Sequence, residues 1–222
     1  MLKKIFGALL LLITIQSHSY AQQDAMYTQY AFNALALNPA YAGSRNNVLN
    51  ATALYRRQWI GIEGAPETQT LSFDMPVNEK RVGLGVQFFN DKIGITKTTG
   101  AYASYAYRIE MENGNLALGL QAGMTNFRAD FTSVALNTGS PTDPAFSENI
   151  NKFLPNFGAG VYFNTDRFYV GASVPHLFNN KLTDHTVDVS NSFSRQYIHT
   201  FITMGYVFDG IRWLYLIHSV DL

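Results

Sequence analysis

Residues 116–124 read Leu116-Ala117-Leu118-Gly119-Leu120-Gln121-Ala122-Gly123-Met124. Every even position is apolar and every odd position is small or polar. A period of two places these sets on opposite faces of a β-strand. The pattern recurs in Val82–Phe88 and, less perfectly, in Tyr197–Phe208. The sequence therefore predicts a sheet with one apolar face and one small or polar face.

The N-terminus has the pattern of an export signal. Lys3 and Lys4 precede an apolar core over 5–15, and Ser19-Tyr20-Ala21 is a small-x-small site, which predicts cleavage between Ala21 and Gln22. No later apolar run approaches the about 20 residues that a membrane-crossing helix needs. An exported chain of two-faced strands can enter lipid only as a closed barrel. We therefore expect an all-β fold, an antiparallel transmembrane β-barrel of the outer-membrane type, in the bacterial outer membrane.

Composition agrees with this class of fold. The 222 residues have no formal net charge, and 14% are charged against roughly 25% in soluble domains. This balance gives no basic footprint for a nucleic-acid partner. The chain has no cysteine, which excludes lipid attachment through a thiol, thiolate metal sites and a cysteine nucleophile. Composition alone leaves a soluble β-rich secreted protein as an equal alternative.

Three regions are expected: the signal at 1–21, an N-terminal segment at 22–47 that enters or plugs the barrel, and the barrel at 48–222. Within 22–47, one or two helical turns should end at Asn38-Pro39. Polar stretches at 131–152 and 179–196 are predicted to be long outer loops. Turn chemistry at Asn90-Asp91 and Asn113-Gly114 predicts breaks between strands. The expected strands cover 48–62, 68–77, 81–92, 98–111, 114–130, 153–165, 166–178, 197–209 and 211–220.

The sequence contains no pattern typical of an enzyme. His176, His185, His199 and His218 lack metal-ligand spacing, and no GxSxG motif occurs. We predict no catalytic residues, no metal and no cofactor, and expect the strand glycines to relieve crowding inside the barrel or at bends. Five arginines are predicted to point inward toward Asp74, Glu110 or Asp130, with a position at the rim near lipid phosphates or an anion-selectivity ring as alternatives: Arg56, Arg57, Arg81, Arg108 and Arg128. Five aromatic residues suit either an interfacial girdle or the core: Trp59, Tyr105, Tyr107, Tyr162 and Tyr169.

An ordered set of motifs runs through 24–208. The first is Tyr27-Thr28-Gln29-Tyr30-Ala31-Phe32-Asn33, followed by Leu37-Asn38-Pro39-Ala40-Tyr41-Ala42-Gly43-Ser44. Later motifs include Arg57-Gln58-Trp59-Ile60-Gly61-Ile62, Ser72-Phe73-Asp74-Met75-Pro76, Asn90-Asp91-Lys92-Ile93-Gly94 and Gly171-Ala172-Ser173-Val174-Pro175-His176. In this order the chain resembles the PorP/SprF family of type IX secretion system membrane proteins. The resemblance marks candidates for structural or partner-contacting roles: Tyr30, Asn38, Pro39, Tyr41, Gly43, Trp59, Gly61, Pro66, Asp74, Asn90, Asp91, Gly94, Pro175 and His176.

The resemblance implies a non-enzymatic outer-membrane barrel that supports protein secretion, surface attachment of cargo and, in some members, gliding motility. Its implied partners are outer-membrane lipid, other type IX secretion components and a secreted adhesin or cargo. Family members continue beyond the segment that matches 197–208, so we expect the last strands of the family barrel to be missing here. Two alternatives are a passive outer-membrane porin for small solutes and an envelope enzyme in barrel form.

Overall fold

The computed structural model describes residues 33–45, 49–77, 81–133, 149–180, 198–208 and 211–221. The predicted cleavage site Ala21-Gln22, the candidate Tyr30, His185, the side chain of His218 and most of both polar loops lie outside these residues. Nine strands form one sheet in sequence order. They are β1 (Asn50–Arg57), β2 (Glu67–Val77), β3 (Val82–Ile93), β4 (Thr96–Met111), β5 (Gly114–Ala129), β6 (Ile150–Asn164), β7 (Phe168–Val174), β8 (His199–Phe208) and β9 (Ile211–Asp221).

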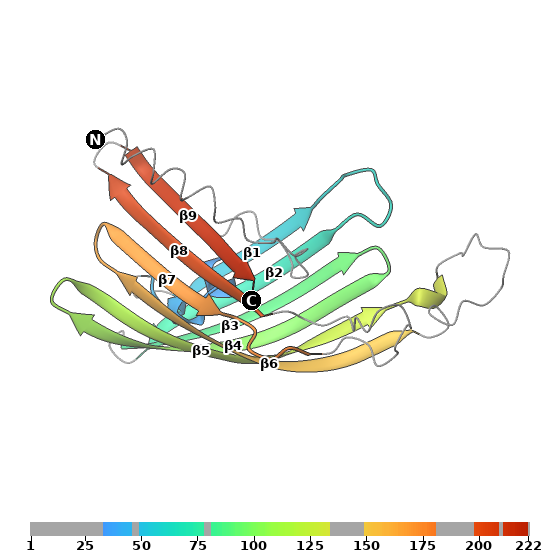
Figure 1. Ribbon diagram of the computed structural model, residues 1–222, viewed down its shortest axis with the longest axis horizontal. Coiled ribbons are helices and arrows are strands. Elements are labelled where there is room, and N and C mark those ends of the chain that lie inside the picture. Colours follow the sequence, from blue (N-terminus) through green and yellow to red (C-terminus); the bar gives the residue numbers. More distant parts are fainter. Residues whose placement is uncertain are drawn as a thin grey trace, which may run out of the picture.

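Every strand pairs antiparallel with the next one along the chain. The sheet curls into a half-barrel, with β1 and β9 as the edges of its described part (Figure 1). β4 and β5 each have 16 residues, more than the about 9–11 that a tilted strand needs to cross a bilayer. The prediction of an all-β antiparallel fold of the outer-membrane barrel type is confirmed. Among the described residues, no helix is both long and apolar enough to span a membrane.

The two faces of the sheet have the character that the alternation predicts. Leu71, Phe88 and Leu120 lie on the outer face, where their side chains are 40%, 49% and 63% exposed. The inner face is small and polar, and several of its polar side chains are buried: Thr68, Thr70, Ser72, Gln87, Ser104, Gln121, Thr125, Asn156 and Ser173. A soluble protein shows the opposite arrangement, with apolar side chains buried. An apolar exterior around a polar interior is the arrangement of a membrane barrel.

The strands connect differently at the two ends of the sheet. At the short-turn end, β4 and β5 are joined through Glu112–Asn113, and β6 and β7 through 165–167. At the long-loop end, the connections are 58–66, the tight turn at 94–95, 130–149 and 175–198. Outer-membrane barrels have their short turns in the periplasm and their long loops outside.

Three predicted boundaries are wrong. The stretch 48–62 ends as a strand at Arg57, because Gln58 already belongs to a loop closed by its N–H bond to the Pro66 carbonyl (3.0 Å). Asn90-Asp91 does not break β3, because the two side chains accept hydrogen bonds from Thr99 (3.0 Å) and Thr68 (2.5 Å) and the chain turns later, at Gly94. The stretch 166–178 ends as a strand at Val174, after which the chain folds over the inner face.

Residues 33–45 lie inside the curl of the sheet (Figure 1). They form two short 3₁₀ turns, η2 (Ala34–Ala36) and η3 (Pro39–Tyr41). The predicted turn before Asn38-Pro39 is present, and Pro39 then begins a second turn, because its fixed φ suits a first helical position. The core of this half-barrel is therefore the contact between 33–45 and the inner face.

Candidate functional site

Asn38 ties the segment 33–45 to β6. Its side-chain oxygen accepts a hydrogen bond from the Ala40 N–H (2.9 Å) and so caps η3. Its side-chain nitrogen donates to the carbonyl of Val161 (3.0 Å). Asn38 is buried, and Pro39 is fully buried beside it. The Asn-Pro pair therefore makes the local turn and a contact between residues 123 positions apart.

Two serines of the inner face hold the same segment from other strands. The Ser173 hydroxyl of β7 donates to the Leu37 carbonyl (2.6 Å). The Ser72 hydroxyl of β2 donates to the side-chain oxygen of Asn33 (3.0 Å). Each bond satisfies a buried polar group on both sides, and a buried group left unsatisfied would cost about 1–3 kcal/mol. The segment is thus anchored on both sides of the curl.

A charged cluster holds the end of the segment. The Gly43 N–H donates to an Asp74 carboxylate oxygen (2.9 Å), which also accepts from the Asn50 amide (3.3 Å). The Arg108 guanidinium donates to the Ala42 carbonyl and lies in the field of Asp74. Gly43 has φ +60°, and a Cβ there would lie 2.7 Å from the backbone of Met75. Only glycine fits this backbone at this distance from β2.

Glycine also forms the floor under η3. A Cβ on Gly119 of β5 would overlap the backbone of Pro39 and Ala40. Beside it, Tyr41 packs edge-on against Tyr162, with ring centroids 5.2 Å apart, and Ala40 and Ala117 are buried in the same cluster. The prediction that strand glycines relieve crowding inside the barrel is confirmed at Gly119.

A second cluster covers the inner face toward the long-loop end. The chain after β7 folds back over it, so that the Gln121 amide donates to the Pro175 carbonyl (2.9 Å). The Tyr102 hydroxyl lies 2.8 Å from the Thr125 hydroxyl and 3.5 Å from Nδ1 of His176. Asn156 is buried, and its side-chain oxygen accepts from the N–H groups of Leu177 (3.0 Å) and Phe178 (3.1 Å).

These two clusters bind the chain's own backbone. Polar side chains and backbone groups of the inner face form hydrogen bonds with the segments 33–45 and 175–178. Within the described ranges, no group of three or more His, Asp or Glu side chains could hold a metal ion. The chain's own segments 33–45 and 175–178 thus cover parts of the inner face of the half-barrel.

One family model, described as type IX secretion system membrane protein PorP/SprF, matches residues 19–219. The chain belongs to the PorP/SprF family. It is thus a membrane component of the type IX secretion system. No match is found among the curated proteins or among the solved structures.

The structure brings together five of the residues that the PorP/SprF resemblance marked: Asn38, Pro39, Tyr41, Gly43 and Asp74. Pro175 and His176 lie together in the second cluster. Trp59, 65% exposed, Gly61 and Pro66 belong to the 58–66 loop, which contacts the next turn through a bond from the Gly94 N–H to the Gly64 carbonyl (2.8 Å). Asn90 lies on the outer face and Asp91 on the inner face, so these neighbours share no site.

The expected inward arginine network is correct for Arg108 and wrong for Arg57 and Arg128. Arg57 lies on the outer face, where its Nε is 3.0 Å from Glu67. Arg128 donates to the side-chain oxygen of Asn126 (2.7 Å) on the same face. Both occupy strand positions out of phase with the buried ones. Of the aromatic candidates, Tyr105 and Tyr107 are exposed on the outer face, whereas Tyr162 is in the core.

Sequence reasoning missed Ser72, Ser173 and Asn156 as anchors. Each lies at an inner-face position of a strand, and Ser173 and Asn156 are two residues from a glycine that approaches another segment. The sequence signal that could have found them is a polar residue two positions from a strand glycine, and therefore on the same face of the strand. It identifies the face but not the partner, because the partner backbone comes from distant segments.

Replacing Asn156 with alanine should loosen the chain after β7. The Phe178 N–H would lose its acceptor, whereas the Leu177 N–H would keep its bond to the Phe157 carbonyl (2.8 Å), so the free energy of unfolding should fall by about 1–3 kcal/mol. Urea unfolding in detergent and limited proteolysis after β7 measure the change. Asn151→Ala is the matched control, because Asn151 is exposed on the same strand, and it should change stability by less than about 0.5 kcal/mol. Equal stability of the two variants would contradict this role of Asn156.

Proposed function

We propose that this protein is a non-enzymatic outer-membrane component of the type IX secretion system that supports protein secretion, surface attachment of cargo and gliding motility. Family membership and the exposed apolar face of the sheet support this assignment. The observation that carries it is the inner face bonded to the chain's own backbone at 33–45. An interior used in this way favours a part that works through contacts with other proteins.

In this proposal, 1–21 is an export signal cleaved between Ala21 and Gln22, 22–47 is a plug, and 48–222 is the barrel domain. The plug enters at the short-turn end, which is the periplasmic end of such barrels. Components of the secretion system would contact the protein there. The 58–66 loop, with exposed Trp59, Ile60 and Ile62, offers an apolar contact for a secreted adhesin or other cargo at the opposite end.

Deleting 24–44 from the full chain should abolish type IX secretion. The deletion removes the Asn38, Leu37 and Gly43 contacts together, and the inner face would lose its partner backbone. Comparison of the proteins in the culture medium and on the cell surface of the deletion strain and its parent measures the effect. Outer-membrane fractionation and heat-modifiable mobility of the deletion protein show whether the barrel still assembles. Normal secretion by an assembled deletion protein would contradict the proposal.

The passive-channel alternative makes an opposite electrical prediction. The intact chain in a planar bilayer should give no regular conductance steps, because 33–45 lies across the interior. Uniform, reproducible steps from the intact chain would favour a solute channel. The same recording on the deletion protein controls for leakage through the emptied barrel.

A further inference from the structure

The outer face carries two rows of mostly polar side chains at its long-loop end, and both follow directly from the strand register. One, the basic row, runs from β1 to β6 through residues that are direct partners: Arg57, Glu67, Lys92, Lys97, Arg128 and Asn151. The other, the amide row, lies two residues further into the sheet: Tyr55, Gln69, Asn90, Thr99, Asn126 and Phe153.

The basic row brings like charges together. Lys92 pairs directly with Lys97, and Lys97 pairs directly with Arg128. Like charges directly opposite each other destabilise a sheet. The one carboxylate of the row, Glu67, is the direct partner of both Arg57 and Lys92, and its side chain is 3.0 Å from Arg57. An anion placed on Lys92, Lys97 and Arg128 would remove this repulsion.

The acids nearest in sequence are directed elsewhere. Asp91 lies on the inner face, where it accepts a hydrogen bond from Thr68 (2.5 Å). Asp130 accepts from the Thr132 hydroxyl (3.1 Å) beyond the end of β5. Arg128 is held in place by its bond to Asn126 (2.7 Å), whose amide in turn donates to Asn151 (2.8 Å). The Arg128 guanidinium is therefore fixed by a chain of hydrogen bonds across β5 and β6.

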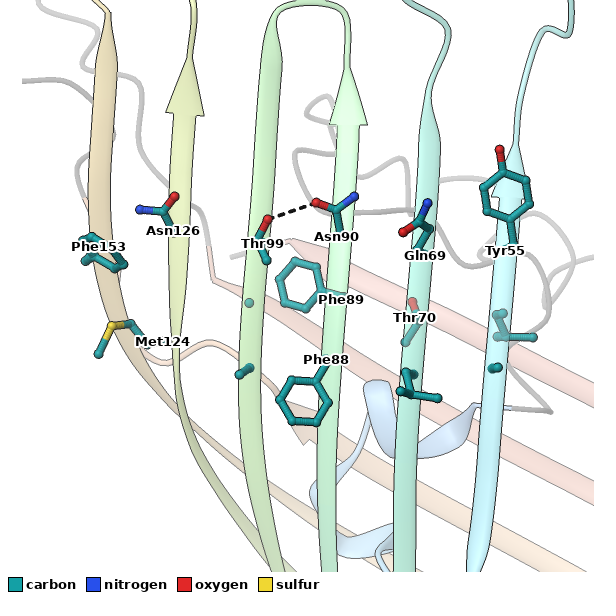
Figure 2. A pocket seen from close by; sticks show the side chains of 15 residues that line it. Tyr55, Gln69, Thr70, Phe88, Phe89, Asn90, Thr99, Met124, Asn126 and Phe153 are labelled. Atoms are coloured by element: carbon teal, nitrogen blue, oxygen red, sulfur yellow. Dashed lines mark hydrogen bonds between the residues drawn. The ribbon is translucent and has the colours of Figure 1, made fainter.

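The amide row forms one side of a groove that continues over the apolar side chains of Leu71, Phe88 and Met124. It has a volume of about 790 Å³, within the range of about 300–1,000 Å³ for small-molecule sites. Figure 2 shows Phe88 and Met124 below the polar side chains of Asn90 and Asn126. The small side chain of Ala101 lies between Phe88 and Met124 in the register and leaves room between them. Phe88 and Met124 are 49% and 51% exposed.

We propose that this surface binds a phosphorylated lipid of the outer leaflet. The lipid phosphates lie on Lys92, Lys97 and Arg128, and an acyl chain lies in the groove beneath them. Long-loop ends of such barrels face outward, so the row stands at the height of the outer headgroups. Lysine and arginine near an anionic lipid surface gain favourable electrostatic energy. The inference rests on the proposed function only in placing the sheet in the outer membrane.

The opposite rim differs in charge. Exposed Glu110, Glu112 and Asp166 lie at the short-turn end together with Arg81 and Arg167. Neutralising two cations at that rim removes the same charge as neutralising two in the basic row. The chain thus offers a matched pair of double variants, K92Q/K97Q and R81Q/R167Q.

The test uses the purified full chain in neutral detergent, with bound lipid counted by native mass spectrometry. Its probes are bisphosphorylated lipid A, the same lipid without phosphates, and inorganic phosphate. Each lysine near an anionic lipid contributes about fivefold, so K92Q/K97Q should bind lipid A about 25-fold more weakly. R81Q/R167Q should bind as the parent protein does. Equal losses in both double variants, or equal binding of the dephosphorylated lipid, would overturn the proposal.

The groove is tested separately. A101L fills the groove and should weaken lipid A binding, whereas A103L adds the same volume to the same exposed face outside the groove and should not weaken it.

In neutral detergent without lipid, K92Q/K97Q should melt at or above the temperature of the parent, because the like-charge contacts are gone. If inorganic phosphate binds as tightly as lipid A and displaces it, the site is only an anion site and the lipid assignment is overturned.

Outer-membrane fractionation of the parent chain separates the two ideas. A chain found outside the outer membrane contradicts the proposed function. A chain that is found in the outer membrane but binds lipid A equally well with and without its phosphates contradicts only the lipid site.

Discussion

Leucine at position 119 should expel the segment 33–45 from the interior of the sheet. Even a single added Cβ would overlap the backbone of Pro39 and Ala40, and a leucine adds three more carbons. Overpacking alone costs about 1–3 kcal/mol. Expulsion would also leave the anchoring groups of Ser173, Ser72 and Asp74 without their partners. We expect the free energy of unfolding to fall by more than about 3 kcal/mol.

Two measurements test Gly119→Leu. Protease should cut within 33–45 in the variant and not in the parent, and the heat-modifiable folded band should melt earlier. Ala122→Leu is the matched control, because Ala122 is exposed on the outer face of the same strand and a leucine there extends into lipid. Asn38→Ala weakens the attachment of the segment 33–45 by removing its side-chain hydrogen bonds, without adding volume. A protected segment and unchanged stability in Gly119→Leu would show that the packing on β5 does not hold it.

Removal of the Asp74 carboxylate should have the second large effect. Asp74→Ala deprives the Gly43 N–H and the Asn50 amide of their acceptor and leaves Arg108 without this counter-charge. A buried donor left without its acceptor costs about 1–3 kcal/mol. Two donors lose their acceptor here and Asp74 is half-buried, so we expect a loss of about 2–4 kcal/mol. Urea unfolding in detergent gives the value.

A double-mutant cycle separates the charge effect from the lost hydrogen bonds. Adding Arg108→Met to Asp74→Ala should cost less than the sum of the two single changes, because the unpaired cation is gone. Glu110→Ala, an exposed acid on β4, is the control and should change stability by less than about 0.5 kcal/mol. Strict additivity of Asp74→Ala and Arg108→Met would mean that the two side chains are not coupled.

Local patterns allowed much of the fold to be predicted. The alternation in 116–124 correctly assigns Leu118 and Leu120 to the outer face and Gly119 and Gln121 to the inner face. The hairpin at Asn113-Gly114 is present, with Met111 paired to Gly114. The predicted break at Asn90-Asp91 was wrong, because turn propensity considers the two residues without their neighbours on other strands. Hydroxyls on neighbouring strands satisfy both side chains and keep the strand extended.

The candidate site was predicted in part. The motif residues Asn38, Gly43 and Asp74 were marked separately, but their contacts join segments 31 and 123 residues apart. Ser72, Ser173 and Asn156 were missed because a serine or asparagine in a strand has the same local signature whether it faces water or a buried carbonyl. The basic row is likewise invisible in the sequence, since its charges come from five strands and meet only through the register.

The sequence by itself determined that the strands have two unlike faces, because side-chain direction along an extended backbone depends only on the parity of the residue number. It also marked Asn38-Pro39 as a turn, since proline restricts the residue before it. Only the tertiary structure decided that this turn lies inside the sheet and which groups hold it there. Those contacts depend on how distant strands align, and hydrogen-bond registers across a sheet are set by the assembled whole rather than by neighbours along the chain.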